Sequence, residues 1–154
     1  MATRPPFQRL LDEHSRDVHR FLRGLVGPDA AEDCLQETLM AALRAYPELE
    51  HATNLRGWLF TIAHRKGIDH LRQRGKEHPS EDLPEAPVHD EEPPDRLLWD
   101  QVAGLPDKQR AAVTLRFVGD MAYASIADII ECSEAAARQN VRAGLATLRK
   151  GITT

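Results

Sequence analysis

Residues 133–150 read SEAAARQNVRAGLATLRK, and their apolar and polar positions fall on opposite sides of a helix. The apolar positions recur every three or four residues, as on one buried helix face; they are Ala137, Val141, Leu145, Leu148 and Ile152. The opposite side carries Ala135, Arg138, Gln139, Arg142 and Arg149. Ser133 is a favourable N-cap residue, so the helix is predicted to begin directly after it.

The preceding residues 123–133, YASIADIIECS, predict a shorter helix and a tight turn, so the two segments together predict a helix-turn-helix. Arg and Gln near the start of the second helix suit the DNA major groove, because Arg pairs bidentately with guanine and Gln with adenine. An ordinary surface helix with solvated arginines has the same pattern. This segment by itself leaves both interpretations open.

The composition of the 154-residue chain favours two small helical domains. Aromatic residues make up 5% of the chain, and runs of alternating β-branched residues are missing, so a sheet has little to be built from. The sequence shows no apolar run of 18 residues and no charged-then-apolar leader, which argues against membrane insertion and secretion and favours a cytoplasmic protein. Cys34 and Cys132 lack zinc-site spacing and are expected to be reduced core residues.

The formal net charge of −4 is unevenly distributed along the chain. Residues 56–76 contain six basic residues and one acid, whereas residues 77–95 contain eight acids and no Lys or Arg. The acidic segment, EHPSEDLPEAPVHDEEPPD, also holds five of the ten prolines and has no helical periodicity. It predicts a flexible linker over 77–95 between a first domain, 1–76, and a second domain, 96–154.

The first domain is predicted to contain three helices. The first has a core stripe that ends at Gly24 to Gly27, and the second runs from Pro28 to about Tyr46. The outer face of the second helix carries acidic and polar residues at spacing 0, 3, 4 and 7, namely Asp33, Gln36, Glu37 and Met40. On pattern alone, a solvated helix face explains this stripe.

The third helix is predicted over 55–76, LRGWLFTIAHRKGIDHLRQRGK, with Asn54 as its N-cap. Its apolar residues lie on two sides, so we expect it at the centre of its bundle, with Trp58 in the core. Arg65, Arg72 and Lys76, at spacing 0, 7 and 11, form a basic ridge that suits a phosphate backbone. His64 and His70 lie too far apart around the helix to hold a metal together, so no metal or other cofactor is expected.

Four motifs follow one another in a specific order: AEDCLQET (31–38), NLRGWLFTIAHRKGIDHLR (54–72), LPDKQRAAVTLRF (105–117) and YASIADIIECS (123–133), before the final basic helix. Together they resemble the two domains of extracytoplasmic-function sigma factors, the smallest class of bacterial sigma-70-type factors. The resemblance covers roughly 7–76 and 96–150. It implies an all-α fold: a three-helix bundle, sigma region 2, and a helix-turn-helix domain, sigma region 4, joined by a flexible acidic linker.

The resemblance also implies a function. Such a protein binds core RNA polymerase and directs promoter recognition and melting, with no catalytic chemistry, cofactor or small-molecule substrate of its own. The stripe Asp33, Gln36, Glu37 and Met40 matches the helix that faces a coiled coil on the largest core subunit. In the family, the loop 48–54 captures a flipped base of the −10 element and the helix after it opens and reads that element.

The resemblance assigns two sets of DNA-binding residues. Those matched to the −10 element are His51, Thr53, Asn54, Arg56, Arg65, Lys66, Arg72 and Lys76. Those matched to the −35 element, on the recognition helix in duplex DNA, are Ser133, Ala135, Arg138, Gln139, Arg142 and Arg149.

Several positions depart from the family pattern. Arg65 stands where Asn is frequent and Thr61 where a basic residue is frequent, so the family's −10 preference does not transfer. Glu131 replaces the usual Gly of the turn, where a left-handed backbone costs a non-Gly residue about 1 kcal/mol, so either the turn is altered or this domain is slightly strained. Asn140 replaces a basic residue, which predicts fewer and weaker −35 contacts.

Two alternatives stay open at this point. A two-domain helix-turn-helix regulator would bind DNA without polymerase, usually as a dimer. For regulation, sigma factors of this class are commonly held by an anti-sigma protein between the domains, whereas the acidic linker could itself shield Arg65, Arg72 and Arg142. We favour the protein partner, because charge on the linker is screened beyond about 8 Å at physiological salt.

Overall fold

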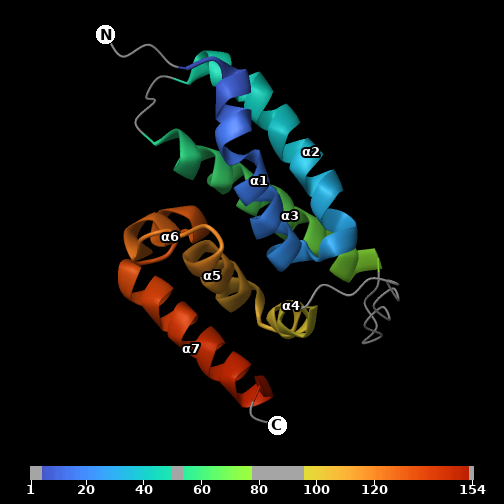
Figure 1. Ribbon diagram of the computed structural model, residues 1–154, viewed down its shortest axis with the longest axis vertical. Coiled ribbons are helices and arrows are strands. Elements are labelled where there is room, and N and C mark those ends of the chain that lie inside the picture. The colour runs from blue at the N-terminus through green and yellow to red at the C-terminus, as the bar shows by residue number, and fades with distance from the viewer. Residues whose placement is uncertain (1–4, 50–53, 78–95, 153–154) are drawn as a thin grey trace.

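The computed structural model describes residues 5–49, 54–77 and 96–152, and every element in these ranges is a helix (Figure 1). The first group contains α1 (Phe7–Val26), α2 (Pro28–Ala45), the 3₁₀ turn η1 (Tyr46–Glu48) and α3 (Leu55–Glu77). The second contains α4 (Arg96–Ala103), α5 (Asp107–Phe117), α6 (Tyr123–Ile130) and α7 (Glu134–Ile152). The all-α expectation is confirmed. None of these helices combines the length and apolar character that crossing a membrane requires.

The first group is a three-helix bundle in which α3 is central, as predicted. The ring of Phe21 on α1 lies 5.6 Å, centroid to centroid, from the ring of Phe60 on α3. At Gly67 of α3, an added Cβ would lie 2.5 Å from a methyl carbon of the buried Leu25, so a larger residue here would force the Leu25 side chain of α1 to shift. Because α3 contacts α1, α2 and also α6, it buries residues on two sides.

Local signals in the sequence set the helix boundaries of this group. Pro28 begins α2, and the helix ends at Ala45, one residue before the predicted end. Asn54 caps α3 as expected, because its Oδ1 accepts a 3.0 Å hydrogen bond from the backbone N–H of Gly57. Trp58 is half-buried, with its ring 6.1 Å from that of Tyr46, which confirms a packing role.

In the second group, α6 and α7 form the predicted helix-turn-helix. Glu131 has φ 58° and ψ 56°, so of the two alternatives the turn is the one that keeps the left-handed backbone, although the residue is not glycine. Ser133 caps α7, because its Oγ accepts a 3.0 Å hydrogen bond from the N–H of Ala136. Of the predicted inner stripe, Ala137, Val141 and Leu148 are buried and Leu145 is half-buried, whereas the side chain of Ile152 lies outside the described part.

The two groups pack directly against each other. The larger of two hydrophobic core clusters runs through both groups, with contacts of α1 to α4 and α5 and of α3 to α6. Where α5 crosses α1, an added Cβ on Gly24 would lie 2.8 Å from a methyl carbon of Thr114 and 2.8 Å from the ring of Trp99. The predicted tether, residues 77–95, lies almost entirely outside the described residues. Direct packing of the two groups is a feature that sequence analysis did not predict.

Candidate nucleic-acid and protein interfaces

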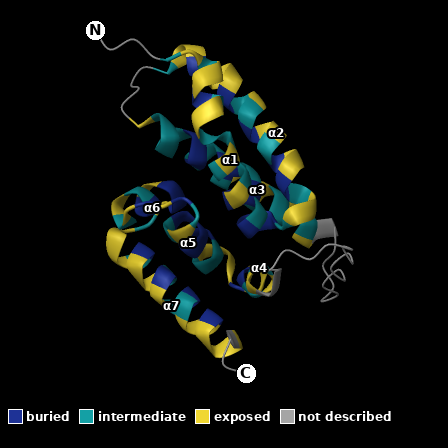
Figure 2. Ribbon diagram, viewed as in Figure 1, coloured by how far each residue is buried: buried dark blue, intermediate teal, exposed yellow. Residues whose placement is uncertain are grey.

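The outer stripe of α2 is a continuous exposed surface. Asp33, Gln36 and Glu37 are all exposed, and Met40 keeps 55% of its surface accessible. Leu43, which sequence analysis missed, extends this surface by one turn and is 56% exposed. Figure 2 shows the exposed residues along the outer side of α2. The position of Leu43 three residues after Met40 was the available signal, because residues at this spacing share a helix face.

The inner side of α2 explains why this stripe points outward. Thr38 is buried, and its Oγ1 donates a 2.7 Å hydrogen bond to the carbonyl oxygen of Cys34. Burial, and then the nearby carboxylates of Glu37 and Asp33, raise the pKa of the Cys34 thiol to about 11. Cys34 is therefore an unreactive core residue, as its place in the sequence pattern predicted.

The outer face of α7 presents all six residues that were matched to the −35 element. Each of them is exposed: Ser133, Ala135, Arg138, Gln139, Arg142 and Arg149. Asn140 is half-buried, and its Nδ2 donates a 3.0 Å hydrogen bond to the carbonyl oxygen of Ala136. The amide at this departure from the family pattern therefore turns back to its own helix, which agrees with fewer contacts to DNA.

The start of α3 holds two of the residues matched to the −10 element. Asn54 uses its side-chain oxygen as the helix cap, and Arg56 is half-buried with its Nη2 3.3 Å from Oδ2 of Asp17. The Arg56 guanidinium also lies 4.7 Å from the ring centroid of Phe60. These contacts fix Arg56 against α1. His51 and Thr53 fall outside the described residues.

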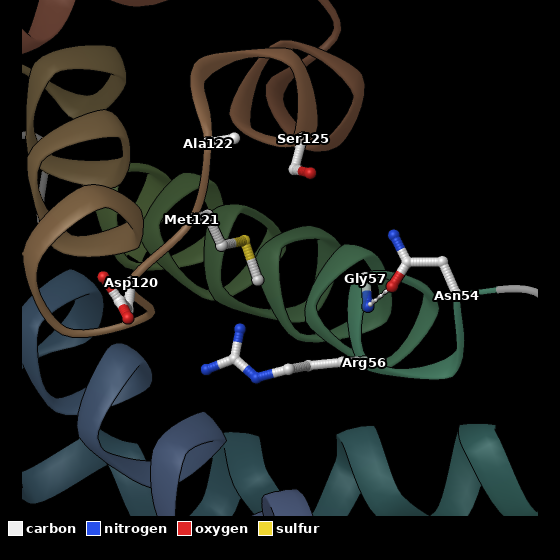
Figure 3. Close-up of a pocket in the computed structure, with 7 residues that line it drawn as sticks. All are labelled: Asn54, Arg56, Gly57, Asp120, Met121, Ala122 and Ser125. Carbon is white, nitrogen blue, oxygen red and sulfur yellow. Dashed lines mark hydrogen bonds between the residues drawn. The ribbon is translucent and has the colours of Figure 1, made fainter.

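Arg56 also points into a small cavity between the two groups of helices (Figure 3). The cavity has a volume of about 170 Å³, and the residues that line it are Asn54, Arg56, Gly57, Asp120, Met121, Ala122 and Ser125. Asp120 has φ 52°, a second left-handed turn residue that sequence analysis did not single out. The beginning of α3 therefore faces the loop that leads into α6.

The basic ridge of α3 runs beside the helix-turn-helix. Arg65 and Arg72 are exposed and Lys66 is half-buried, whereas the side chain of Lys76 lies outside the described part. Arg65 Nη2 lies 3.9 Å from Oε1 of Glu131, so an ion pair joins the ridge to the turn after α6. The ridge is thus close to the turn that precedes the recognition helix.

His64 lies beside this ion pair and is half-buried. Burial lowers its pKa, the charge of Glu131 raises it, and the charges of Arg65 and Arg72 lower it further. His64 therefore favours its neutral form in the folded protein.

Comparisons with known proteins match both groups of helices. Residues 10–77 match Sigma-70 region 2, and residues 95–148 match Sigma-70, region 4. The ECF RNA polymerase sigma factor SigM of Bacillus subtilis is 33% identical over 132 residues, which span 79% of this chain and 80% of the relative. The chain is an extracytoplasmic-function (ECF) sigma factor of the sigma-70 family.

Other relatives of this ECF sigma factor agree with the assignment. The ECF RNA polymerase sigma-E factor of Haemophilus influenzae is 23% identical over 154 residues, which span 88% of this chain and 81% of the relative. The sigma factor RpoE of Bartonella quintana, solved in complex with the anti-sigma factor NepR, shares the fold with a TM-score of 0.81. That likeness covers 96% of this chain and 97% of the other, at 24% sequence identity.

The ECF sigma factor is thus a DNA-binding transcription initiation factor that acts with RNA polymerase. Its helices α1 to α3 fall largely within the region 2 match, and α4 to α7 fall largely within the region 4 match. These matches therefore favour a sigma factor over the alternative, a helix-turn-helix regulator that acts without polymerase.

Proposed function

We propose that the outer stripe of α2 is the main contact with core RNA polymerase, on a coiled coil of its largest subunit. Support comes from the side chains themselves: Asp33, Gln36 and Glu37 are exposed and, among the described residues, make no hydrogen bond or ion pair within the protein. Met40 and Leu43 add an exposed apolar end to this polar surface. A partner helix that carries basic and apolar residues fits such a surface.

We propose that α3 and the loop before it contact the −10 element. The residues are Asn54, Arg56, Arg65, Lys66 and Arg72, together with His51, Thr53 and Lys76, which lie outside the described residues or have side chains there. Arg65 and Arg72 are exposed cations about two helical turns apart on one helix, and such cations suit contacts to the phosphate backbone. Arg56 is held by Asp17, so it meets DNA from a fixed position.

We propose that α7 lies in the major groove of the −35 element and reads it with Arg138, Gln139 and Arg142. Ser133 and Ala135 lie at the start of the helix, nearest the groove floor in the usual docking of a recognition helix. Arg149 lies 11 residues beyond Arg138, about 16 Å along the helix at about 1.5 Å per residue, so it meets phosphates instead.

In the structure, region 2 and region 4 pack directly against each other, and we call this the closed arrangement. The −10 and −35 surfaces cannot both bind promoter DNA in the closed arrangement. Elements centred near −10 and −35 lie about 25 base pairs apart, or about 85 Å at about 3.4 Å per base pair. A compact chain of this length has a radius of gyration of only about 15 Å. Binding to a promoter on polymerase therefore requires region 2 and region 4 to separate.

An anti-sigma protein is the proposed regulator of this separation. The Bartonella quintana sigma factor was solved with its anti-sigma factor, and its fold matches this chain over both groups of helices. A protein that binds both regions at once would hold them together and keep the −10 and −35 surfaces from DNA. The protein acts in the cytoplasm, with polymerase, and has no catalytic activity of its own.

The exposed stripe of α2 is the observation that carries the proposed polymerase contact, and co-purification tests it. The double variant Asp33→Arg with Glu37→Arg should lose binding to purified core polymerase, because it reverses the charge of the stripe. Its matched control is Asp12→Arg with Glu13→Arg, the same charge change on the exposed side of α1. Equal retention of core polymerase by both double variants would contradict the assignment.

A further inference from the structure

Two guanidinium groups lie over the ring of Tyr123. The guanidinium carbon of Arg116 is 4.5 Å from the ring centroid, and that of Arg138 is 5.3 Å from it. Arg116 is near the end of α5, Tyr123 is the first residue of α6, and Arg138 belongs to the second turn of α7. The ring therefore links all three helices that form the DNA-binding half of region 4.

The two arginines differ in what else holds them. Arg116 is half-buried, and its Nη1 donates a 2.8 Å hydrogen bond to the carbonyl oxygen of Met121, so it fixes the approach to α6. Arg138 keeps 56% of its side chain exposed, and within the described ranges its one other restraint is Glu134, whose Oε1 lies 2.7 Å from Nη2. Arg116 thus belongs to the scaffold, and Arg138 belongs to the surface.

The two restraints on Arg138 act on different parts of the guanidinium. Glu134 takes up an N–H group, and a bidentate pair with guanine needs two N–H groups on one edge. The carboxylate also faces repulsion from DNA phosphates. The Tyr123 ring holds the guanidinium through a cation–π contact, with 5.3 Å from the guanidinium carbon to the ring centroid, and this contact does not need a particular N–H group, so this restraint is compatible with reading a base.

We propose that Tyr123 is a positioning residue for −35 recognition: its ring holds the guanidinium of Arg138 in place after Glu134 releases it to DNA. This rests on the proposed role of Arg138 in the −35 element. A free arginine loses much rotamer freedom when it pairs with a base, and a stacked arginine has already lost part of it. The stack therefore strengthens base discrimination without touching DNA.

The test uses the holoenzyme, which is core polymerase with this chain bound. It measures how strongly the holoenzyme discriminates between bases in promoter duplexes that are randomised in the −35 element, the upstream hexamer. Arg138→Ala first identifies the base pair at which preference is lost. At that same base pair, Tyr123→Leu is expected to reduce discrimination about 2- to 5-fold, as expected for loss of one exposed cation–π contact. Tyr123→Phe keeps the ring and should retain the preference. Phe117→Leu, the same kind of change at a 60% exposed aromatic residue of the region, is the matched control.

The outcomes separate this inference from the assignment on which it rests. If Arg138→Ala leaves every hexamer preference unchanged, the −35 role of Arg138 fails and the inference fails with it. If Arg138→Ala relaxes one base pair and Tyr123→Leu, still folded, relaxes none, the inference alone is overturned. Equal weakening on all sequences by Tyr123→Phe would instead show that the hydroxyl contacts phosphate, and this also overturns it.

A second measurement does not depend on how well Tyr123→Leu folds. In the intact protein, the side-chain protons of Arg138 should show the upfield NMR shift caused by an aromatic ring, and Tyr123→Phe should preserve that shift. Unshifted Arg138 protons in the unmodified chain would contradict the stack directly.

Discussion

The guanidinium of Arg110 donates a 2.8 Å hydrogen bond from Nη1 to the backbone carbonyl of Leu25, so a side chain of region 4 caps the end of a region 2 helix. Its Nη2 donates a 2.9 Å hydrogen bond to the carbonyl of Leu105, and only 13% of the side chain is exposed. Burial lowers the pKa of Arg110, but an arginine stays charged in proteins. A cation at the C-terminal end of α1 also complements the helix dipole.

Removing this guanidinium should weaken the closed arrangement. Arg110→Ala leaves the carbonyls of Leu25 and Leu105 without this donor at a packed interface, with an expected loss of about 1 to 3 kcal/mol. Thermal melting measures the loss, and small-angle scattering should show a larger radius of gyration. Arg9→Ala, which removes an exposed arginine paired with Glu13, should change stability by less than about 0.5 kcal/mol. Identical melting and scattering for the two variants would contradict the capping role.

Gly24 offers a more selective way to separate the two regions. Gly24→Ala places a methyl group against Thr114 and Trp99, both in region 4, and neither a β-branched side chain nor an indole ring yields easily. Gly75→Ala is the matched control, because nothing lies within 4 Å of a Cβ at that position of α3. The control should gain up to about 1 kcal/mol from helix propensity. Gly24→Ala should be less stable than this control and more expanded in scattering; a similar gain without expansion would argue against close packing at Gly24.

Acidification should destabilise the folded protein. Burial is the main cause that lowers the pKa of both His64 and His14 from the ordinary value of 6.5. The unfolded chain therefore takes up protons first as the pH falls, and stability decreases through about pH 6.5. Urea denaturation at pH 7.5 and 5.5 measures this loss, which His64→Gln should reduce. An identical pH dependence in the variant would show that His64 does not contribute.

Substitutions on the outer face of α7 should distinguish the arginines that contact bases from the arginine that contacts phosphates. Arg138→Ala and Arg142→Ala should each cost about 1 to 3 kcal/mol on the preferred −35 sequence and less on a mutated one, as expected for arginines bidentate to guanine. Arg149→Ala should weaken binding to all sequences alike. Competition binding of the holoenzyme measures both effects. If all three variants lose the same affinity on every DNA sequence, α7 contacts only phosphates.

The parts of the fold that depend on local signals could be predicted from the sequence. The two faces of α7 and the caps Asn54 and Ser133 each rest on a few neighbouring residues. The sequence left open whether the turn at Glu131 is altered, and the structure has the left-handed backbone there. The helices α4 and α5 were not predicted as separate elements. α4 has only eight residues, too few by themselves for a clear apolar period, and α6, of the same length, was predicted only together with the turn and the capped helix that follow it.

Contacts between residues that are far apart in the sequence leave no such local pattern. The interface between the regions depends on a side chain that meets a backbone carbonyl, Arg110 to Leu25, across 85 positions of the sequence. Arg56 and Asp17 are likewise far apart in the sequence, by 39 positions. Their pairing fixes Arg56, which we expect to contact DNA. In the candidate sites, exposure of the α2 stripe and of the α7 face followed from periodicity, whereas the stacking of Arg138 on Tyr123 needed the turn that brings α6 and α7 together.

Mapping of transcript 5′ ends tests the central claim most directly. Genomic DNA is transcribed in vitro by core polymerase alone, by core with this chain, and by core with the variant Asp33→Arg with Glu37→Arg. We expect new start sites only with the unmodified chain, preceded by two shared elements at −10 and −35, and little specific binding of these promoters by the chain without core. No new start sites, or equally strong specific binding by the chain alone, would contradict its function as a sigma factor.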